Sequence, residues 1–189
     1  MSSKWKLDPK TTALVLIDLQ NAVLSRETKP YPAGEVVERS RAMAEAFRAK
    51  GALVVYVRVP LKDILSLTTD EAMILPKDIP AAASEIADAA GMQSGDLLVS
   101  KRHWGAFAQT TLETELRNRG VETIVLAGIA TNMGVESTLR QGTGLGFAFI
   151  TVEDACSTFS PEMQDFAFKT IFPRLSHVRT TQQVLEALA

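Results

Sequence analysis

Cysteine and histidine are scarce in this sequence. Cys156 is the single cysteine among 189 residues, which excludes an intrachain disulfide framework and a cysteine-rich metal site. The only histidines, His103 and His177, lie far apart along the chain, which disfavours a metal centre. Glycines recur at positions 142, 144 and 146, but no Gly-Lys-Ser/Thr triplet of a phosphate-binding loop follows them. The sequence therefore predicts neither a metal nor a cofactor.

Long apolar runs and blocks of basic residues are also missing. The formal net charge is −2, so the composition disfavours a nucleic-acid partner. No apolar run approaches the length of a membrane span, and the first dozen residues lack the apolar core of a signal peptide. We expect no membrane association, a cytoplasmic location and one domain over residues 1–189. A hydrophobic content of 46% is ordinary for such a domain.

What the sequence does contain is an alternation of short apolar runs and amphipathic stretches. This pattern predicts an α/β fold: a doubly wound, Rossmann-like, parallel six-stranded sheet with helices on both faces, in three layers α/β/α. The expected strands are residues 12–19, 53–59, 97–101, 123–127, 147–152 and 176–179. The expected helices are residues 35–50, 81–90, 110–119, 132–139, 161–172 and 181–188, with a capping box formed by Thr110 and Glu113 in the third.

The stretch from residue 123 to residue 138, TIVLAGIATNMGVEST, combines a strand, a sharp turn and a helix start. Its first part is apolar and β-branched, as in a strand that is buried on both faces. Thr131 or Asn132 can cap the helix that follows. Such a turn directs free backbone N–H groups and the positive end of the helix dipole toward one point. The residue at this point is Gly134, which has no side chain for chemistry.

Two charged residues end other predicted strands. Asp18 lies near the end of the first strand and Lys101 at the end of the third. The carboxyl ends of parallel strands share one edge of a sheet, where ligands bind, so both can approach Gly134. A carboxyl group for proton transfer, a cation and paired N–H donors are typical of a hydrolytic site. A structural ion pair is the alternative interpretation of the two charged residues.

These residues lie in segments that resemble the isochorismatase-like hydrolases, a superfamily that includes nicotinamidases and N-carbamoylsarcosine amidohydrolases. The matching segments are ALVLIDLQN around Asp18, the stretch from KRHWGAF to VESTLR between residues 101 and 140, and FITVEDACST near the single cysteine. The resemblance implies that Asp18 is the catalytic acid or base and Lys101 its cationic partner. It also implies an oxyanion hole made by the backbone N–H groups of Ala130 and Gly134, and a cis peptide bond before Ala130.

The sequence departs from most of that superfamily at Gly134, where they carry a nucleophilic cysteine. Without the thiol, a covalent thioester route is closed. True isochorismatases resemble this chain in having glycine there, and they hydrolyse a vinyl ether by protonating the enol carbon. We therefore expect a metal-independent hydrolase of a small metabolite. The alternatives are a catalytically silent metabolite-binding protein and a C–N amidohydrolase, including one that uses Cys156, which we interpret as a buried structural thiol.

The substrate-binding side chains are expected near the same edge. Arg58 is the candidate anion anchor, Trp104 and Phe107 are candidates for an aromatic wall, and Asn132 can donate into the pocket. A structural ion pair, core packing and a helix cap are the respective alternatives. True isochorismatases carry a Tyr at the position of Ala130, so we expect a substrate other than isochorismate. The resemblance and the apolar content predict a homo-oligomer, dimer or tetramer.

Overall fold

Six parallel strands form one sheet in the computed structural model, which describes residues 5–71 and 74–188. The strands are β1 (Thr12–Ile17), β2 (Leu53–Arg58), β3 (Leu97–Ser100), β4 (Thr123–Ile129), β5 (Ala148–Ser157) and β6 (His177–Arg179). Their order across the sheet is β3-β2-β1-β4-β5-β6, and every neighbouring pair is parallel. The order reverses between β1 and β4, the place where open α/β sheets bind ligands. The predicted six-stranded, doubly wound sheet is confirmed.

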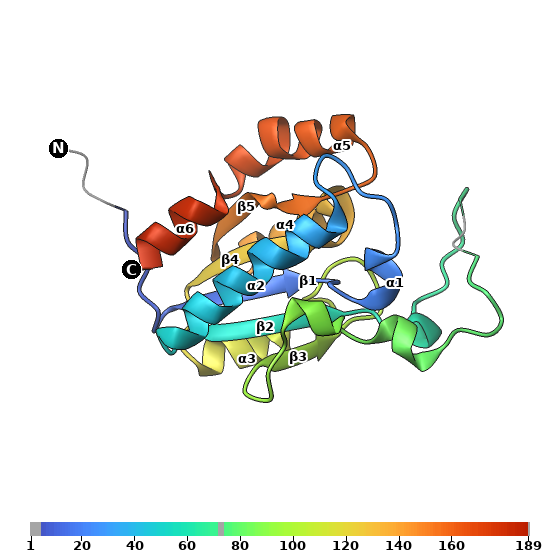
Figure 1. Cartoon of the computed structure of the whole chain (residues 1–189), viewed down its shortest axis with the longest axis horizontal. Helices are drawn as coiled ribbons and strands as arrows, with labels where there is room; N and C mark the ends of the chain where they lie inside the picture. Colours follow the sequence, from blue (N-terminus) through green and yellow to red (C-terminus); the bar gives the residue numbers. More distant parts are fainter. Residues whose placement is uncertain (1–4, 72–73, 189) are drawn as a thin grey trace.

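Helices cover both faces of the sheet (Figure 1). The α-helices are α1 (Asn21–Leu24), α2 (Ala33–Ala49), α3 (Leu112–Asn118), α4 (Glu136–Gly144), α5 (Pro161–Phe166) and α6 (Thr181–Leu188). α2 and α6 pack on each other over one face, while α3 and α4 cover the other. The described helices include none that is both long and apolar enough to cross a membrane.

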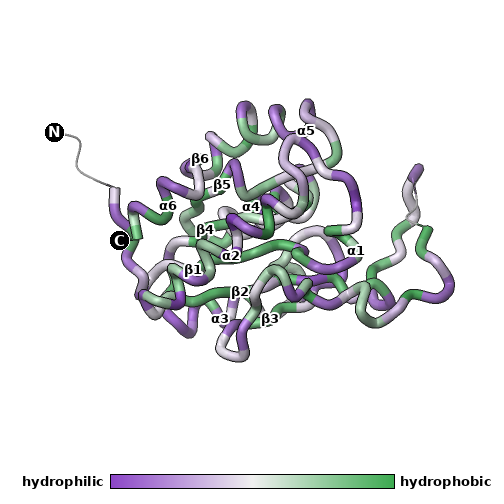
Figure 2. Tube along the Cα trace, in the orientation of Figure 1, coloured by the Kyte–Doolittle hydropathy of each residue, from purple (hydrophilic) through white to green (hydrophobic). Residues whose placement is uncertain are grey.

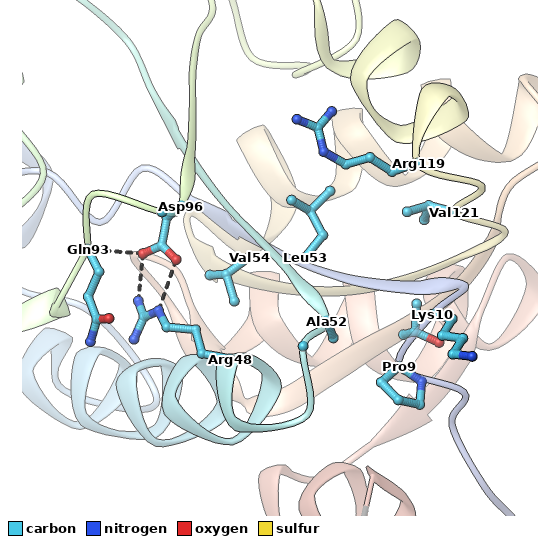
Figure 3. Close-up of a pocket in the computed structure, with 13 residues that line it drawn as sticks. Pro9, Lys10, Arg48, Ala52, Leu53, Val54, Gln93, Asp96, Arg119 and Val121 are labelled. Atoms are coloured by element: carbon cyan, nitrogen blue, oxygen red, sulfur yellow. Dashed lines mark hydrogen bonds and ion pairs between the residues drawn. The ribbon is translucent and has the colours of Figure 1, made fainter.

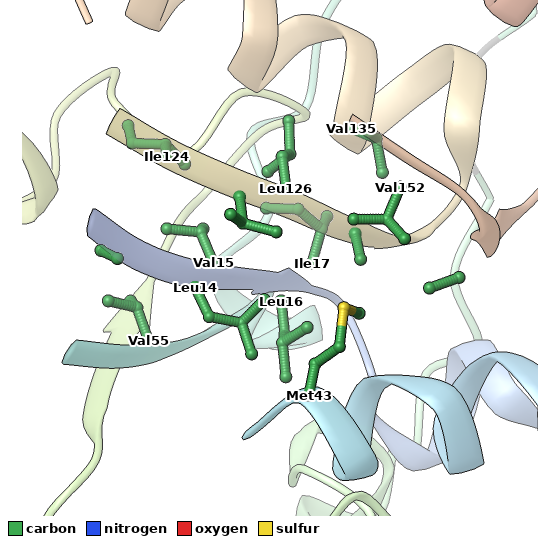
Figure 4. Packing of buried hydrophobic residues seen from close by; sticks show 14 of the residues in the cluster. Leu14, Val15, Leu16, Ile17, Met43, Val55, Ile124, Leu126, Val135 and Val152 are labelled. Carbon is green, nitrogen blue, oxygen red and sulfur yellow. The ribbon is translucent and has the colours of Figure 1, made fainter. Parts of the chain in front are cut away.

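The core lies on both sides of the two central strands. All six residues of β1 are buried. The green of hydrophobic residues follows β1, β2 and β4 through the middle of the molecule (Figure 2). Figure 4 shows Met43 of α2 and Val135, which precedes α4, on opposite sides of these strands. Because both faces are covered, the central strands are continuous apolar runs without alternation. This burial holds the strand ends, and the residues just after them, in fixed positions.

The connection between β2 and β3 differs from the prediction. The sequence predicts one helix over residues 81–90, but the chain forms two 3₁₀ turns, Ala81–Ser84 and Asp88–Ala90. Between them, Ile86 forms an antiparallel bridge with Gln20, and the Ala87 N–H donates to the carbonyl of Leu19 at 2.9 Å. Residues in this extended pairing cannot continue a helix. The helix prediction is wrong because this segment is tied to the end of β1.

Two further local expectations are wrong. The predicted capping box does not form, since the Thr110 hydroxyl donates to the carbonyl of Ala106 and the N-cap of α3 is Thr111. β5 extends to Ser157, five residues beyond its predicted end. It continues past Glu153 and Asp154, where the sequence predicts the strand to end. Side-chain hydrogen bonds and sheet pairing with β4 decide both boundaries.

Candidate active site

A cavity of about 490 Å³ lies at the carboxyl edge of the sheet. Asp18, Lys101, Ala130, Gly134 and Trp104 all line it, so five of the predicted site residues meet there although they come from different strands. The outer part of the wall comes from the β2–β3 connection, which extends beyond the sheet in Figure 1. The remaining lining is mainly apolar and includes Val23, Val59, Leu61, Ile64, Leu75, Ile79, Ile129, Met133 and Phe159.

An ion pair forms the deep end of this cavity. The Lys101 ammonium donates to Asp18 Oδ2 at 2.8 Å and to the carbonyl of His103 at 3.1 Å. Only 1% of the Lys101 side chain is exposed, and 11% of the Asp18 side chain. Asp18 follows β1 with a positive φ of 53°, and its backbone N–H donates to Val57 on β2 at 2.9 Å. This backbone bend directs the carboxylate into the cavity.

Burial controls the protonation of Asp18. Its Oδ1 atom is buried and has no hydrogen-bond partner within the described residues. Burial raises the pKa of Asp18 above its ordinary value of 3.8, while the charge and hydrogen bond of Lys101 act in the opposite direction. The cost of removing the carboxylate from water is the larger effect. Asp18 therefore retains a proton to higher pH than an exposed aspartate does.

The turn after β4 brings the backbone close to this carboxylate. The Ile129–Ala130 peptide bond is cis, and residues Thr131–Val135 form a π-helical turn before α4. A Cβ atom added at Gly134 would lie 2.8 Å from Ile17 Cγ2 and 3.2 Å from Asp18 Oδ2. Because real Cβ atoms keep larger distances, only glycine fits here without a shift.

A second glycine permits the close approach of β4 to β1. Gly128 has a φ of 125°, and a Cβ atom there would lie 2.2 Å from the carbonyl oxygen of Ile17. The register of β4 against β5 shifts at the same place, between Leu126 and Gly128. Ile17, the residue before Asp18, is therefore in backbone contact with β4, the strand before Gly134. This contact sets the distance between Asp18 and Gly134.

Thr138 connects the helix of this turn to the loop that carries Trp104. Its hydroxyl donates to the carbonyl of Gly134 at 2.7 Å and accepts the N–H of Ala106 at 3.1 Å. Next to this contact, Gln141 accepts the N–H of Phe107 at 3.1 Å. These hydrogen bonds hold the loop after Lys101 against α4, and they position Trp104 at the cavity.

Three of the predicted substrate-binding residues do not line the cavity. Arg58 donates to the hydroxyl of Ser100, its register partner on β3. Phe107 is buried and stacks on Phe147 with ring centroids 5.7 Å apart. Asn132 accepts a hydrogen bond from Thr158 rather than capping the helix. Neighbouring elements take up each of these side chains, so the structure does not bring them to the ion pair.

The cavity also contains residues that the sequence-based interpretation missed. The Gln20 side chain donates to the Val59 carbonyl at 3.0 Å and accepts its N–H at 2.8 Å. Its place two residues after Asp18, in the segment IDLQN, is the signal that could have identified it. Arg26 and Phe159 meet at the cavity from distant parts of the chain, and no local pattern predicts that contact.

Cys156 lies away from this cavity. It is fully buried in β5 opposite Gly128, and it is absent from the residues that line the site. Burial strongly raises the pKa of its thiol, which keeps the thiol protonated and unreactive. These observations fit a structural thiol and disfavour the amidohydrolase hypothesis that uses Cys156.

A second cavity, of about 410 Å³, lies at the opposite edge of the sheet, next to the starts of β1 and β2 (Figure 3). Arg48 forms an ion pair there with Asp96 at 2.6 Å, and Figure 3 shows Lys10 and Arg119 apart from that pair. The described part of the chain contains no group of three His, Cys, Asp or Glu side chains that could hold a metal ion. None of the predicted site residues lines this second cavity, so the first cavity is the candidate active site.

Comparison with known proteins gives one consistent family. The isochorismatase domain family matches residues 12–183. The chain is 43% identical to the uncharacterized isochorismatase family protein YecD of Escherichia coli O157:H7, over 97% of this chain and 99% of that protein. It is 40% identical to the uncharacterized isochorismatase family protein YwoC of Bacillus subtilis, over 98% of both chains.

Solved structures agree with these relatives. An isochorismatase family protein from Burkholderia thailandensis superposes with a TM-score of 0.92 at 40% identity, covering 98% of this chain and 99% of that chain. A cysteine hydrolase from Pseudomonas syringae pv. phaseolicola superposes with a TM-score of 0.78 at 25% identity, covering 99% and 98% of the two chains.

Proposed function

The chain belongs to the isochorismatase family, and from that premise we propose that it is a hydrolase of a small metabolite that acts without a cysteine nucleophile. The observation that carries this proposal is the Asp18–Lys101 pair at 2.8 Å, next to a glycine at which a side chain would require Ile17 or Asp18 to shift. At this glycine there is no thiol to form a covalent intermediate, so water is the nucleophile.

Vinyl-ether hydrolysis fits a protonated Asp18 best. The Asp18 carboxyl group donates its proton to the enol carbon of the substrate, which leaves an oxocarbenium ion and the Asp18 carboxylate. Water adds to that cation and returns a proton to Asp18. The resulting hemiketal breaks its C–O bond to the leaving group and gives a ketone and an alcohol. The raised pKa of Asp18 supports its role as the acid.

Lys101 and the turn after β4 stabilise negative charge in this scheme. The Lys101 ammonium stabilises the Asp18 carboxylate that forms when the proton leaves, because the two groups are already hydrogen-bonded. The backbone N–H groups of Ala130 and Gly134 form the oxyanion hole and donate to the oxygen that becomes negative as the hemiketal breaks. Both residues line the cavity, which supports this assignment.

A panel of small vinyl ethers and amides tests the proposal, with products detected by mass spectrometry. We expect turnover of at least one vinyl ether, and a loss of about 100-fold or more in Asp18→Asn and in Lys101→Met. Thermal denaturation of both variants controls for folding. Unchanged turnover in these variants contradicts the assigned roles. Ligand binding without any product would instead favour a catalytically silent binding protein.

A further inference from the structure

Arg26 presents a cationic group at the mouth of the candidate active site. It lines the cavity together with Asp18 and Lys101, yet it is exposed whereas they are buried. Its guanidinium carbon lies 3.7 Å from the centroid of the Phe159 ring, which also lines the cavity. A guanidinium over an aromatic face is held by cation–π attraction while its N–H donors stay available in its own plane.

The loop that carries Arg26 is fixed to the chain segment that carries Phe159. Lys29 and Thr158 form an antiparallel bridge, with N–H to carbonyl distances of 2.7 Å and 2.8 Å. The Tyr31 N–H also donates to the Ser157 hydroxyl at 3.2 Å. These contacts join the loop after α1 to the end of β5 directly beside the stacked pair. Arg26 is thus positioned in advance of binding.

Among the described residues, Arg26 is the cation at the mouth of the cavity that has no acidic partner. At the deep end, the Lys101 ammonium is buried and already donates to Asp18 and to the carbonyl of His103. For the Arg26 guanidinium, the described residues provide no ion pair and no hydrogen-bond acceptor, and it lies over the Phe159 ring. Asp78, an exposed residue of the β2–β3 connection, is the other acidic residue of the lining. An anionic group at the mouth would gain the attraction of Arg26.

The space between the deep ion pair and the mouth is apolar. Side chains from the β2–β3 connection and from the turn after β4 supply it, among them Ile64, Leu75, Ile79 and Met133. Such a wall binds a hydrocarbon or ring through the hydrophobic effect and offers few partners to polar groups. A substrate with several charges would leave some of them without a partner in this space.

We propose that Arg26, held over Phe159, binds a carboxylate of the substrate, so that the substrate class is a monoanion with an apolar body. The carboxylate stays at the mouth, and the bond to be broken lies at Asp18 and Lys101. The position of that bond rests on the proposed function, whereas the carboxylate contact does not. Arg26 is therefore a specificity-determining residue, and it takes the role that the sequence predicts for Arg58.

Calorimetric binding of benzoate and benzamide to the full chain tests this proposal, because the two probes share a ring and differ in charge. We expect the wild type to prefer benzoate and Arg26→Gln to weaken benzoate binding by about tenfold. Benzamide binding should change by less than about twofold in the same variant. Arg26→Lys should give intermediate benzoate affinity, because it keeps the charge and loses the planar donors.

Two other variants separate a specific contact from general electrostatics. Lys29→Gln removes a positive charge from the same loop as Arg26. The Lys29 ammonium pairs with Glu27, and Lys29 does not line the cavity. Benzoate binding should therefore be unchanged in this variant. Asp78→Asn removes a negative charge that repels the benzoate carboxylate, so this variant should bind benzoate more strongly. The melting temperature of each variant reports folding.

The proposal is overturned if the wild type does not bind benzoate, if Arg26→Gln leaves benzoate affinity unchanged, or if that variant weakens both probes equally. These measurements need no turnover. The double variant Asp18→Asn with Lys101→Met should still prefer benzoate through Arg26. A failure of the hydrolase proposal would therefore leave the Arg26 result intact, and the two failures are distinguishable.

Discussion

At the scale of single residues, the contact between Gly134 and the end of β1 decides which chemistry the site can carry. The Ile17 methyl group and the Asp18 carboxylate occupy the space that a side chain at position 134 would need. Ile17 is fully buried in the most covered strand, so it has little freedom to move aside. A side chain introduced at position 134 would therefore force Ile17 or Asp18 to shift.

Gly134→Ala tests this crowding. We expect a loss of about 1–3 kcal/mol in the free energy of unfolding, because the added methyl group overpacks a buried site. Turnover should fall as well, since Asp18 must move. Gly144→Ala is the matched control at the end of α4, where an added Cβ meets no atom within 4 Å. Chemical denaturation measures both variants, and equal stability changes would show that crowding at Gly134 is unimportant.

The protonation of Asp18 predicts a pH dependence. Its pKa is raised in the folded chain, so the folded state binds the proton more tightly than the unfolded state does. Its contribution to the free energy of unfolding is therefore most favourable below pH 3.8 and is lost as the pH rises to the folded value. With Asp18 as the acid, kcat/KM falls as the pH rises through the pKa of Asp18 in the folded chain.

Rate profiles of the wild type and unfolding curves of Asp18→Asn measured against pH check this sign. The variant should lose the part of the pH dependence of stability that comes from this carboxyl group. A value of kcat/KM that rises as the pH passes through this folded pKa would show that Asp18 works as a base.

At the scale of secondary structure elements, the π-helical turn and α4 act together with the loop after β3. Thr138 satisfies two backbone groups at once, one in its own helix turn and one in the loop. It is fully buried, so no water can replace it in either hydrogen bond. The position of Trp104 therefore depends on a hydroxyl group that is not part of the cavity wall.

Thr138→Val removes that hydroxyl while keeping the shape. We expect a loss of about 1–3 kcal/mol in the free energy of unfolding, because the Ala106 N–H remains buried without an acceptor. Thr143→Val is the control, since its hydroxyl donates only to carbonyls within α4, and its effect should stay within about 0.5 kcal/mol. Denaturation curves compare them, and similar losses would argue against the connecting role of Thr138.

At the scale of the whole molecule, Cys156 reports the integrity of the sheet. The thiol is fully buried in β5, opposite Gly128 of β4, and its raised pKa suppresses the thiolate. We expect iodoacetamide to leave the native chain unmodified and to modify it rapidly in denaturant. Mass spectrometry follows the labelling. Fast labelling of the native chain, together with loss of turnover, would restore the hypothesis that this thiol is catalytic.

The sequence by itself determined the order of the strands in the chain, the layers and the central part of the site. Apolar runs identify buried parallel strands, and parallel strands end at one edge, so Asp18, Lys101 and Gly134 were predicted to converge. The end of a strand can be recognised from the local sequence. The regular geometry of a parallel sheet then places these ends at one edge. Cys156 is buried in β5, in agreement with its interpretation as a structural thiol, although it lies beyond the predicted end of that strand.

Only the tertiary structure decided which side chains surround that centre. Arg58 turns to its register partner Ser100, and Phe107 packs on Phe147, while Arg26 meets Phe159 across the cavity mouth. Such contacts depend on where loops return to the sheet, which is set by single hydrogen bonds and by packing between distant segments. The periodicity of a sequence shows which face of a strand or helix is apolar. It does not show which residues of other elements this face contacts.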